Sequence, residues 1–288
     1  DAVTNFTEFR KQVKGLADTL ERNLGENAVS TVKAFERIVS AGLSVNDALG
    51  ATEAITRAAS IAQVDATDIA DQFASTFAVL GHTLEQNLSP AERYNLAFAK
   101  INALEKDTVV TLPQLAEGFN KVAGSADRAG LSFDEVLLLL AALNTAGIKG
   151  SQAGTLLSTA LNKLTNNLGE VEDAFSITIP AGEKTFDTLL RITGILREWI
   201  DTGNGAQAQS AFQNVFGSER STKAIAGLVS QFENIVKLQK RIGTEGGTAL
   251  DVINKLQDDQ NDKLKISTSN LDKQIKRWNG LRTQSSES

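Results

Sequence analysis

The residues that could do chemistry are few, and the single histidine is the first of them. His82 lies in a Leu-Gly-His-Thr turn, and the chain contains no cysteine. One histidine cannot build a transition-metal site unless carboxylates complete it, and the HExxH spacing of zinc proteases does not occur. We therefore interpret His82 as a turn residue that is hydrogen-bonded or faces solvent.

The second candidate is the glycine-rich segment GIKGSQAG, which starts at Gly147. Glycines and a lysine ahead of a helix suggest a phosphate-binding loop, but the spacing differs from GxxxxGK[ST] and the preceding element reads as a helix, not a strand. A turn explains the same residues, because Gly147 would end one helix, Gly150 would turn the chain and Ser151 would cap the next helix. The small residues Ala153 and Gly154 would then let the two helices approach closely.

Carboxylates are numerous, at 35 in the chain, and they are interleaved with lysines. Solvation on a polar helix face is the ordinary explanation, although a glycosidase pair could be hidden among so many acids. No nucleophile elbow, catalytic triad or cofactor loop is recognisable. We therefore predict no enzymatic activity, no catalytic, cofactor-binding or metal-binding residues, and no cofactor. The most obvious acidic clusters are Glu170, Glu172 and Asp173, and Asp258, Asp259 and Asp262.

The composition indicates a folded and mostly helical chain. Of its 288 residues 41% are hydrophobic and only three are proline, which favours helices over disorder or a β-sandwich. The net charge of −6, with acids and bases interleaved, argues against specific nucleic-acid binding. No apolar run approaches the roughly 20 residues that span a bilayer. The absence of methionine, with Asp1 at the start, suggests a processed form or an excerpt of a longer protein.

Residues 1–27 carry an apolar stripe at coiled-coil spacing, flanked by charged residues. We predict a coiled-coil-like helix here. The stripe could pack either on the chain's own domain or on a second copy of the chain. Two to three heptads are too few to distinguish these two partners. The stripe consists of Phe6, Phe9, Val13, Leu16 and Leu20.

Residues 28–242 read as a domain of short helices separated by turns that contain glycine and serine. AGLSVNDALGATEAITRAA, from Ala41, resembles AGLSFDEVLLLLAALNTAG, from Ala129, and VDATDIADQF, from Val64, resembles VTLPQLAEGF, from Val110. These copies do not share one fixed period, which argues against a solenoid and favours a duplicated helical unit. The expected N-caps are Ser44, Thr67, Ser89, Ser132 and Ser151, and the expected helix-ending glycines are Gly42, Gly81, Gly130, Gly147 and Gly169.

Three further segments complete the predicted organisation. Near residues 175–186, β-branched residues followed by Pro-Ala-Gly predict a very small β-hairpin that leans on the helices. Residues 243–249 form the predicted linker, and residues 250–288 a polar amphipathic helix that needs a partner chain or a docking surface. The predicted fold class is all-α: a compact multi-helix domain with one minor β-hairpin, flanked by coiled-coil-like helices at both ends.

Several stretches resemble phage tail tape measure proteins. The segment from Ala129 to Leu164 is similar to the most recognisable stretch of that family and contains its complete AGIKGSQAGT turn. Three flanking pieces occur in the same order as in the family: the upstream helix from Thr111 to Gly130, the predicted hairpin, and AFQNVFGSERSTKAIAGL. The last piece has Phe216, Gly217 and Arg220 in the Phe-Gly-x-x-Arg positions. The likeness covers roughly residues 29–242, and Asn144-Thr145 and the SPAERYNLAFAKINALEKDT segment depart from the pattern.

The resemblance implies a structural protein in the lumen of the phage tail tube that sets tail length during assembly and takes part in genome ejection. It implies self-association as a small homo-oligomer, contact with the tail tube protein, baseplate or tail-tip proteins and tail assembly chaperones, and membrane contact only during ejection. The protein would pass through the cytoplasm of the host bacterium during assembly. The alternative is a peptidoglycan-degrading or membrane-active module of a phage tail protein.

Overall fold

The computed structural model describes residues 2–239, apart from residues 26, 86, 106–107 and 218. Helices joined by turns account for most of this part of the chain, and no strand occurs in it, so the all-α prediction is confirmed. The predicted linker at 243–249 and the predicted helix at 250–288 lie outside the described residues. The helices are α1 (Ala2–Leu24), α2 (Ala28–Ser40), α3 (Val45–Ala62), α4 (Ala66–Leu80), the short 3-10 helix η1 (Gly81–Thr83), α5 (Pro90–Glu105), α6 (Leu112–Arg128), α7 (Phe133–Thr145), α8 (Gly150–Asn166), α9 (Leu168–Phe175), α10 (Thr185–Asp201), α11 (Gly205–Phe216) and α12 (Glu219–Ser230).

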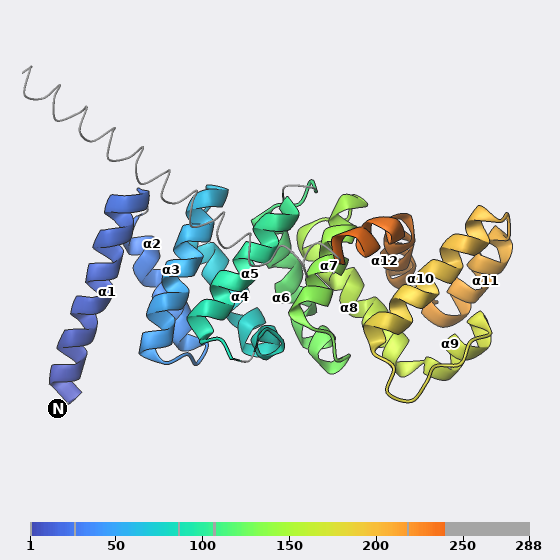
Figure 1. The fold of residues 1–288 in the computed structure, drawn as a ribbon, viewed down its shortest axis with the longest axis horizontal. Helices are drawn as coiled ribbons and strands as arrows, with labels where there is room; N and C mark the ends of the chain where they lie inside the picture. Colours follow the sequence, from blue (N-terminus) through green and yellow to red (C-terminus); the bar gives the residue numbers. More distant parts are fainter. Residues whose placement is uncertain (1, 26, 86, 106–107, 218, 240–288) are drawn as a thin grey trace, which may run out of the picture.

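The helices from α1 to α8 follow one another along the long axis of the elongated molecule, α9 to α11 lie beyond them, and α12 returns to α7 and α8 (Figure 1). The most extensive packing joins helices that are two apart in the chain: α2, α4, α6 and α8 form one continuous layer, and α3 packs on α5 on the other side. The pairs α2–α3 and α6–α7 are helical hairpins, and α4 and α5, which meet through the Phe77 and Tyr94 rings, lie between them. We call this row from α2 to α8 the hairpin stack, and it is similar to the arrangement of a solenoid protein.

This stacking explains the unequal spacing of the two internal echoes. The copies that begin at Ala41 and Ala129 lead into α3 and α7, which lie two hairpins apart. The copies that begin at Val64 and Val110 lead into α4 and α6, which lie one hairpin apart. Their offsets differ because they count different numbers of the same unit, so the unequal spacing is compatible with stacked units and with the predicted duplicated helical unit.

Several helix starts follow the predicted serine caps. The Ser44 hydroxyl accepts from the backbone N–H of Asp47 at 3.2 Å, at the start of α3. Ser132 and Glu135 form a capping box at the start of α7. The Ser89 backbone N–H donates to the Glu92 carboxylate at 2.8 Å, just before Pro90 opens α5.

Two predicted caps lie elsewhere. α4 begins after Asp65, whose carboxylate accepts from the Thr67 backbone N–H at 2.7 Å, so Thr67 is inside the helix. α8 begins at Gly150 after Lys149, and Ser151 is already helical. Of the expected helix-ending glycines, Gly42, Gly130 and Gly147 follow helix ends as predicted, and Gly81 caps the end of α4 while also opening η1, whereas Gly169 lies within α9.

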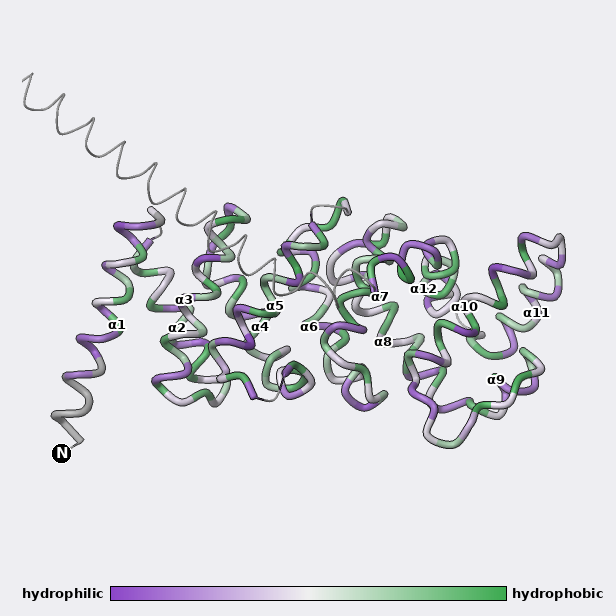
Figure 2. Tube along the Cα trace, in the orientation of Figure 1, coloured by the Kyte–Doolittle hydropathy of each residue, from purple (hydrophilic) through white to green (hydrophobic). Residues whose placement is uncertain are grey.

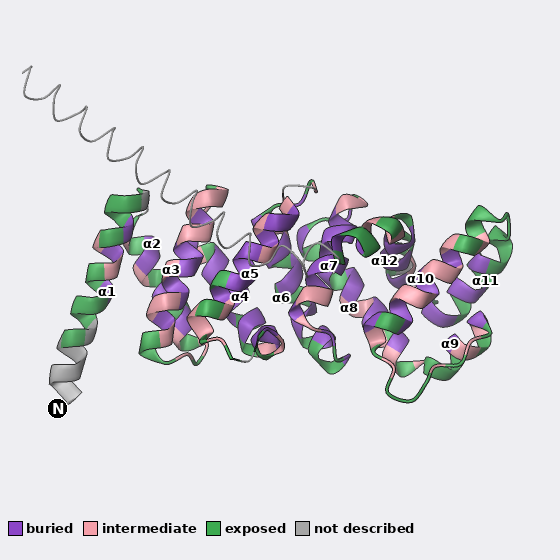
Figure 3. Cartoon of the chain, viewed as in Figure 1, coloured by how far each residue is buried: buried purple, intermediate pink, exposed green. Residues whose placement is uncertain are grey.

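An aromatic cluster joins α4 and α5 to α6 and α7. The Phe77 ring stacks on Tyr94 of α5 with centroids 3.7 Å apart, and Phe119 of α6 stacks on Phe133 of α7 at 4.6 Å. Phe73 contacts both Phe98 and Phe119, which links the two stacks. Burial also raises the pKa of the Tyr94 hydroxyl. The helices carry these buried faces toward one another and leave exposed faces at the outside and along α1 (Figure 3).

The first helix packs on its own chain. α1 lies against α2 and α3, and Val13 and Leu20 of its apolar stripe are buried there, while Leu16 is half-buried. The chain's own domain, and not a second copy of the chain, therefore covers Val13 and Leu20. The Phe6 and Phe9 side chains are outside the described part.

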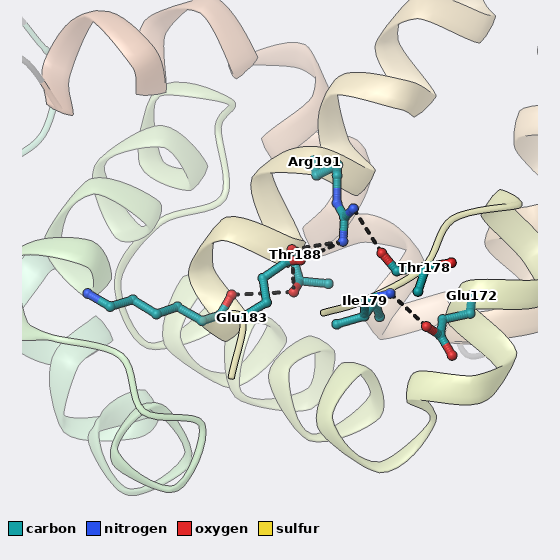
Figure 4. A network of polar contacts seen from close by, with 7 residues as sticks. Glu172, Thr178, Ile179, Glu183, Thr188 and Arg191 are labelled. Atoms are coloured by element: carbon teal, nitrogen blue, oxygen red, sulfur yellow. Dashed lines mark hydrogen bonds and ion pairs between the residues drawn. The ribbon is translucent and has the colours of Figure 1, made fainter. Parts of the chain in front are cut away.

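The predicted β-hairpin is wrong: the segment between α9 and α10 is a loop without strands. Its backbone groups bond to side chains instead of a second strand (Figure 4). The Ile179 N–H donates to the Glu172 carboxylate at 2.6 Å, and Arg191 donates to the Thr178 carbonyl at 3.1 Å. Arg191 also contacts both oxygens of Glu183 at 2.8 Å. These contacts satisfy the β-branched segment locally, so alternation of residue types was not a reliable sign of pairing.

Candidate functional site: the glycine turn between α7 and α8 and the pocket beside it

The glycine turn links α7 to α8 through Gly147 and Gly150, as predicted from the sequence, but without Ser151 as the cap. Gly147 has φ +88° and Gly150 has φ +55°, a region that L side chains rarely adopt. The Ile148 N–H donates to the Leu143 carbonyl at 2.8 Å, which closes the end of α7. Ile148 itself is buried and anchors the turn against the core.

Asn144, one of the residues that departs from the family pattern, holds the turn from inside. Its side chain is fully buried. The amide nitrogen donates to the Leu140 carbonyl at 2.7 Å, and the amide oxygen accepts from the Gly150 N–H at 3.3 Å. A buried amide that satisfies both a carbonyl and an N–H removes two polar groups that would otherwise be costly inside the protein.

Glu117 of α6 closes the turn from the neighbouring helix. Its carboxylate accepts from the Ser151 N–H at 3.1 Å and lies directly against Gly150. A carboxylate at the first turn of a helix also interacts favourably with the helix dipole. The Gly150 and Ser151 N–H groups, which a phosphate would need, are thus already bound to Asn144 and Glu117. The turn interpretation of this segment is supported over the phosphate-loop interpretation.

The small residues in the turn serve a close approach, but between α8 and α6 instead of α8 and α7. A Cβ atom on Gly154 would overlap the backbone of Gly118, so only glycine fits at this crossing. A Cβ on Gly118 would lie 3.0 Å from the Leu140 side chain of α7. Gly118 and Glu117 are neighbours in the chain, so one stretch of α6 provides both the close contact and the carboxylate.

The second family motif packs beside the same turn. A Cβ on Gly227 of α12 would lie 3.0 Å from the Leu143 side chain and 3.1 Å from Ile148, which shows that α12 sits closely on the turn. Phe216 is fully buried at the end of α11, and Gly217 follows it with φ +46°. Arg220, the third residue of the motif, is exposed.

The two motifs meet at a surface pocket of about 470 Å³ between α8 and α12. One wall comes from the first two turns of α8 and the other from the first two turns of α12. Leu156 is 5% exposed and forms an apolar patch in the lining. The lining residues are Ser151, Gln152, Thr155 and Leu156 of α8 and Arg220 and Lys223 of α12.

The other residues considered for chemistry are dispersed. The His82 side chain is 64% exposed, and its Nε2 lies 3.9 Å from Asp127. Glu170 and Asp173 are exposed, while Glu172 bonds to the loop before α10. The cluster of Asp258, Asp259 and Asp262 lies outside the described residues. Within residues 2–239 no group of three or more histidine or carboxylate side chains is placed to hold a metal ion.

Sequence reasoning missed Glu117, Gly118 and the groups with shifted pKa values, among them Glu105 and Asp65. Burial raises the pKa of Glu105, although its carboxylate accepts from the Leu112 N–H. The hydrogen bond from the Ser30 hydroxyl, at 2.7 Å, contributes most to lowering the pKa of Asp65. The Ser30–Asp65 contact spans 35 positions and depends on how α2 packs on α4, whereas Glu105 and Leu112 are only seven positions apart, at the end of α5 and the start of α6.

Comparison with known proteins gives a consistent picture. Residues 10–217 match the family of phage-related minor tail proteins. The chain is also 30% identical over 138 residues to the tape measure protein of Pneumococcus phage Dp-1. That alignment covers 48% of this chain and 11% of the phage Dp-1 protein, so the chain spans only a small part of its relative. No solved structure matches the chain.

The described helices contain none that is both long and apolar enough to cross a membrane. The family match includes both the glycine turn and the hairpin stack, because it runs from α1 to the end of α11. The tape measure resemblance drawn from the AGIKGSQAGT turn is confirmed at the level of the family, and the chain belongs to the phage-related minor tail protein family.

Proposed function

We propose that this chain is a folded segment of a tape measure protein that helps to set tail length and takes part in genome ejection, without catalytic activity. A minor tail protein belongs to the virion, and we place this one in the lumen of the tail tube, after assembly in the host cytoplasm. Its partners would be further copies of itself in a small homo-oligomer, the tail tube protein, baseplate or tail-tip proteins and assembly chaperones.

The main support for the proposal is that helices α2 to α8 of the family-matched region are stacked in a single row. Hairpins that contact only their neighbours add length in equal steps, as in other stacked repeats. The continuous layer α2, α4, α6 and α8 gives such a row within residues 10–217. A ruler needs this additive relation between residues and distance.

The increment per hairpin distinguishes a folded segment from an extended one. An extended helix rises 1.5 Å per residue, so 46 residues would measure about 70 Å. Packed helices lie about 8–10 Å apart, so one stacked hairpin adds only about 10 Å. The two states therefore predict very different changes in tail length for the same deletion.

The test is deletion of residues 64–109 from the parent protein in its phage. The echo between the sequences from Val64 and Val110 lets the chain rejoin at an equivalent position after Gln63. Electron microscopy of the tails should show shortening by about 70 Å if the segment is extended in the tube, or about 10 Å if it stays stacked. Duplication of residues 64–109 is the matched control and should lengthen the tail by the same amount. Unchanged tail length in both variants would contradict the proposal.

A peptidoglycan-degrading role is the second candidate, and Glu105 is the residue that favours it. A carboxyl group with a raised pKa is what a general acid requires at neutral pH. Its hydrogen bond to the Leu112 N–H assigns it instead to the start of α6. Cell-wall turnover by the purified chain that disappears in Glu105→Gln would favour the enzyme.

A further inference from the structure

The pocket between α8 and α12 has a chemical character that differs from the rest of the surface. The chain has a net charge of −6, yet the described side chains that line this pocket include two cations and no carboxylate. Arg220 and Lys223 are three residues apart on α12, so they project from the same face of the helix. Neither has an ion-pair partner among the described side chains, whereas Arg37, Lys100 and Arg191 do.

The opposite wall adds polar groups that can donate hydrogen bonds. Ser151 and Gln152 are exposed on α8 and line the pocket, and their hydroxyl and amide groups can donate hydrogen bonds. The Thr155 hydroxyl donates to the Ser151 carbonyl at 2.8 Å, so it offers only lone pairs. The α8 N-terminus is not the attraction here, because the Ser151 N–H already donates to Glu117. The available donors are therefore side chains.

We propose that this pocket binds a carboxylate side chain from an acidic segment of a partner protein. The Arg220 guanidinium can bind a carboxylate through two parallel hydrogen bonds, and Lys223 adds a second positive charge. The apolar surface of Leu156 suits the methylene groups of a glutamate. A residue bound between α8 and α12 also connects the hairpin stack to the helices that follow it.

A nucleic acid fits the pocket less well. Binding to a phosphate backbone depends on several cations along a track, and affinity rises with the number of phosphates neutralised. Here two cations share one recess on a chain with net negative charge. Such a surface repels a long polyanion overall while it accepts one carboxylate locally.

The test uses the full 288-residue chain and fluorescein-labelled hexaglutamate, with labelled hexaglutamine as the uncharged probe. Fluorescence anisotropy should show binding of hexaglutamate only, weakened by added salt because the contacts are exposed. The double variant Arg220→Gln and Lys223→Gln should bind about tenfold more weakly or worse, since it loses two charge-assisted contacts.

The matched control is Lys121→Gln with Lys163→Gln, which removes two exposed cations of α6 and α8 outside the pocket. It should bind hexaglutamate as the wild type does. Equal weakening in both double variants, unchanged binding in the pocket variant, or no binding by the wild type would each overturn the proposal. Thermal unfolding monitored by circular dichroism verifies that both variants are folded. This inference goes beyond the role in tail length, and its outcome does not depend on that role.

Discussion

The hairpin stack from α2 to α8 and the helices α9 to α11 hold together in different ways. In the stack, large apolar faces meet, an aromatic cluster joins α4 and α5 to α6 and α7, and α6 and α8 touch through their backbones at Gly118 and Gly154. Beyond α8, a loop bridges α9 and α10 through the ion pair of Glu183 and Arg191. Figure 2 shows apolar and polar residues alternating around the helices of both regions.

Both regions consist of amphipathic helices, so amphipathicity alone does not determine how tightly neighbouring helices pack. A backbone contact has no side chain that can move aside, so it tolerates almost no change of volume. A partly exposed ion pair contributes much less, because solvent screens it. The stack should therefore respond to substitutions as a unit, while the loop before α10 should open locally.

The largest expected effect is at the Gly154 crossing. Gly154→Ala should lower the free energy of unfolding by about 1–3 kcal/mol, because the new Cβ overlaps the Gly118 backbone. Urea denaturation followed by circular dichroism measures this change. Gly124→Ala, on an exposed position of α6 with its nearest outside atom 3.7 Å away, is the control. It should stabilise the helix by up to about 1 kcal/mol, because alanine is the better helix former. Equal shifts in both variants would contradict the close contact.

A smaller and more local effect is expected in the loop before α10. Arg191→Met removes the contact of one guanidinium nitrogen with both oxygens of Glu183, which is 14% exposed, and the bond to the Thr178 carbonyl. We expect a loss of about 1 kcal/mol, discounted because the Arg191 side chain is 34% exposed. Hydrogen exchange should accelerate in residues 176–184 and stay unchanged in α6. The control Arg197→Met breaks a more exposed pair with Asp201 on the same helix and should change little. Faster exchange throughout α6 would show that the two regions are one cooperative unit.

The smallest effects concern pH, and two carboxyl groups with shifted pKa values, Glu105 and Asp65, should act with opposite sign. The pKa of Glu105 is raised in the folded state, so its contribution to stability is present below the ordinary value of 4.5 and is lost as pH rises through the raised pKa. The pKa of Asp65 is lowered, so its contribution is present above the ordinary value of 3.8 and is lost as pH falls through the lowered pKa.

Neutral variants reveal these signs against the wild type. The stability of Glu105→Gln relative to the wild type should improve as pH rises from about 4 to 7. The relative stability of Asp65→Asn should worsen as pH rises from about 2 to 5. Urea midpoints measured across both ranges give the two trends. If the relative stabilities of both variants changed in the same direction with pH, burial would not be what determines the pKa of Glu105.

Local signals in the sequence were enough to predict the helices and several of their ends. Ser44 and Ser132 cap α3 and α7 because a serine hydroxyl can bond to the N–H three residues later, which depends only on nearby residues. Gly147 ends α7 for a similarly local reason. The hairpin failed because Ile177 and Ile179 are held by side chains of other helices, a choice that residue alternation does not encode.

The sequence predicted only part of the site, namely the turn between α7 and α8. The turn and its small residues were visible in the sequence, but their partner helix was assigned to α7 instead of α6. The contact of Gly154 with Gly118 and the bond from Ser151 to Glu117 span 36 and 34 positions of chain, and only the stacking order of the hairpins brings them together. The same stacking order joins Arg220 to the α8 turns, so the pocket has no signature in either segment alone.

The backbone contact between α6 and α8 has a mechanical consequence. Because a glycine on each helix occupies the crossing point, a slide by even one residue would place a side chain where no room exists. The joint therefore cannot creep in small steps when the chain is pulled along the row. We expect α6 and α8 to keep their register as the force increases and then to separate in a single step, without gradual sliding.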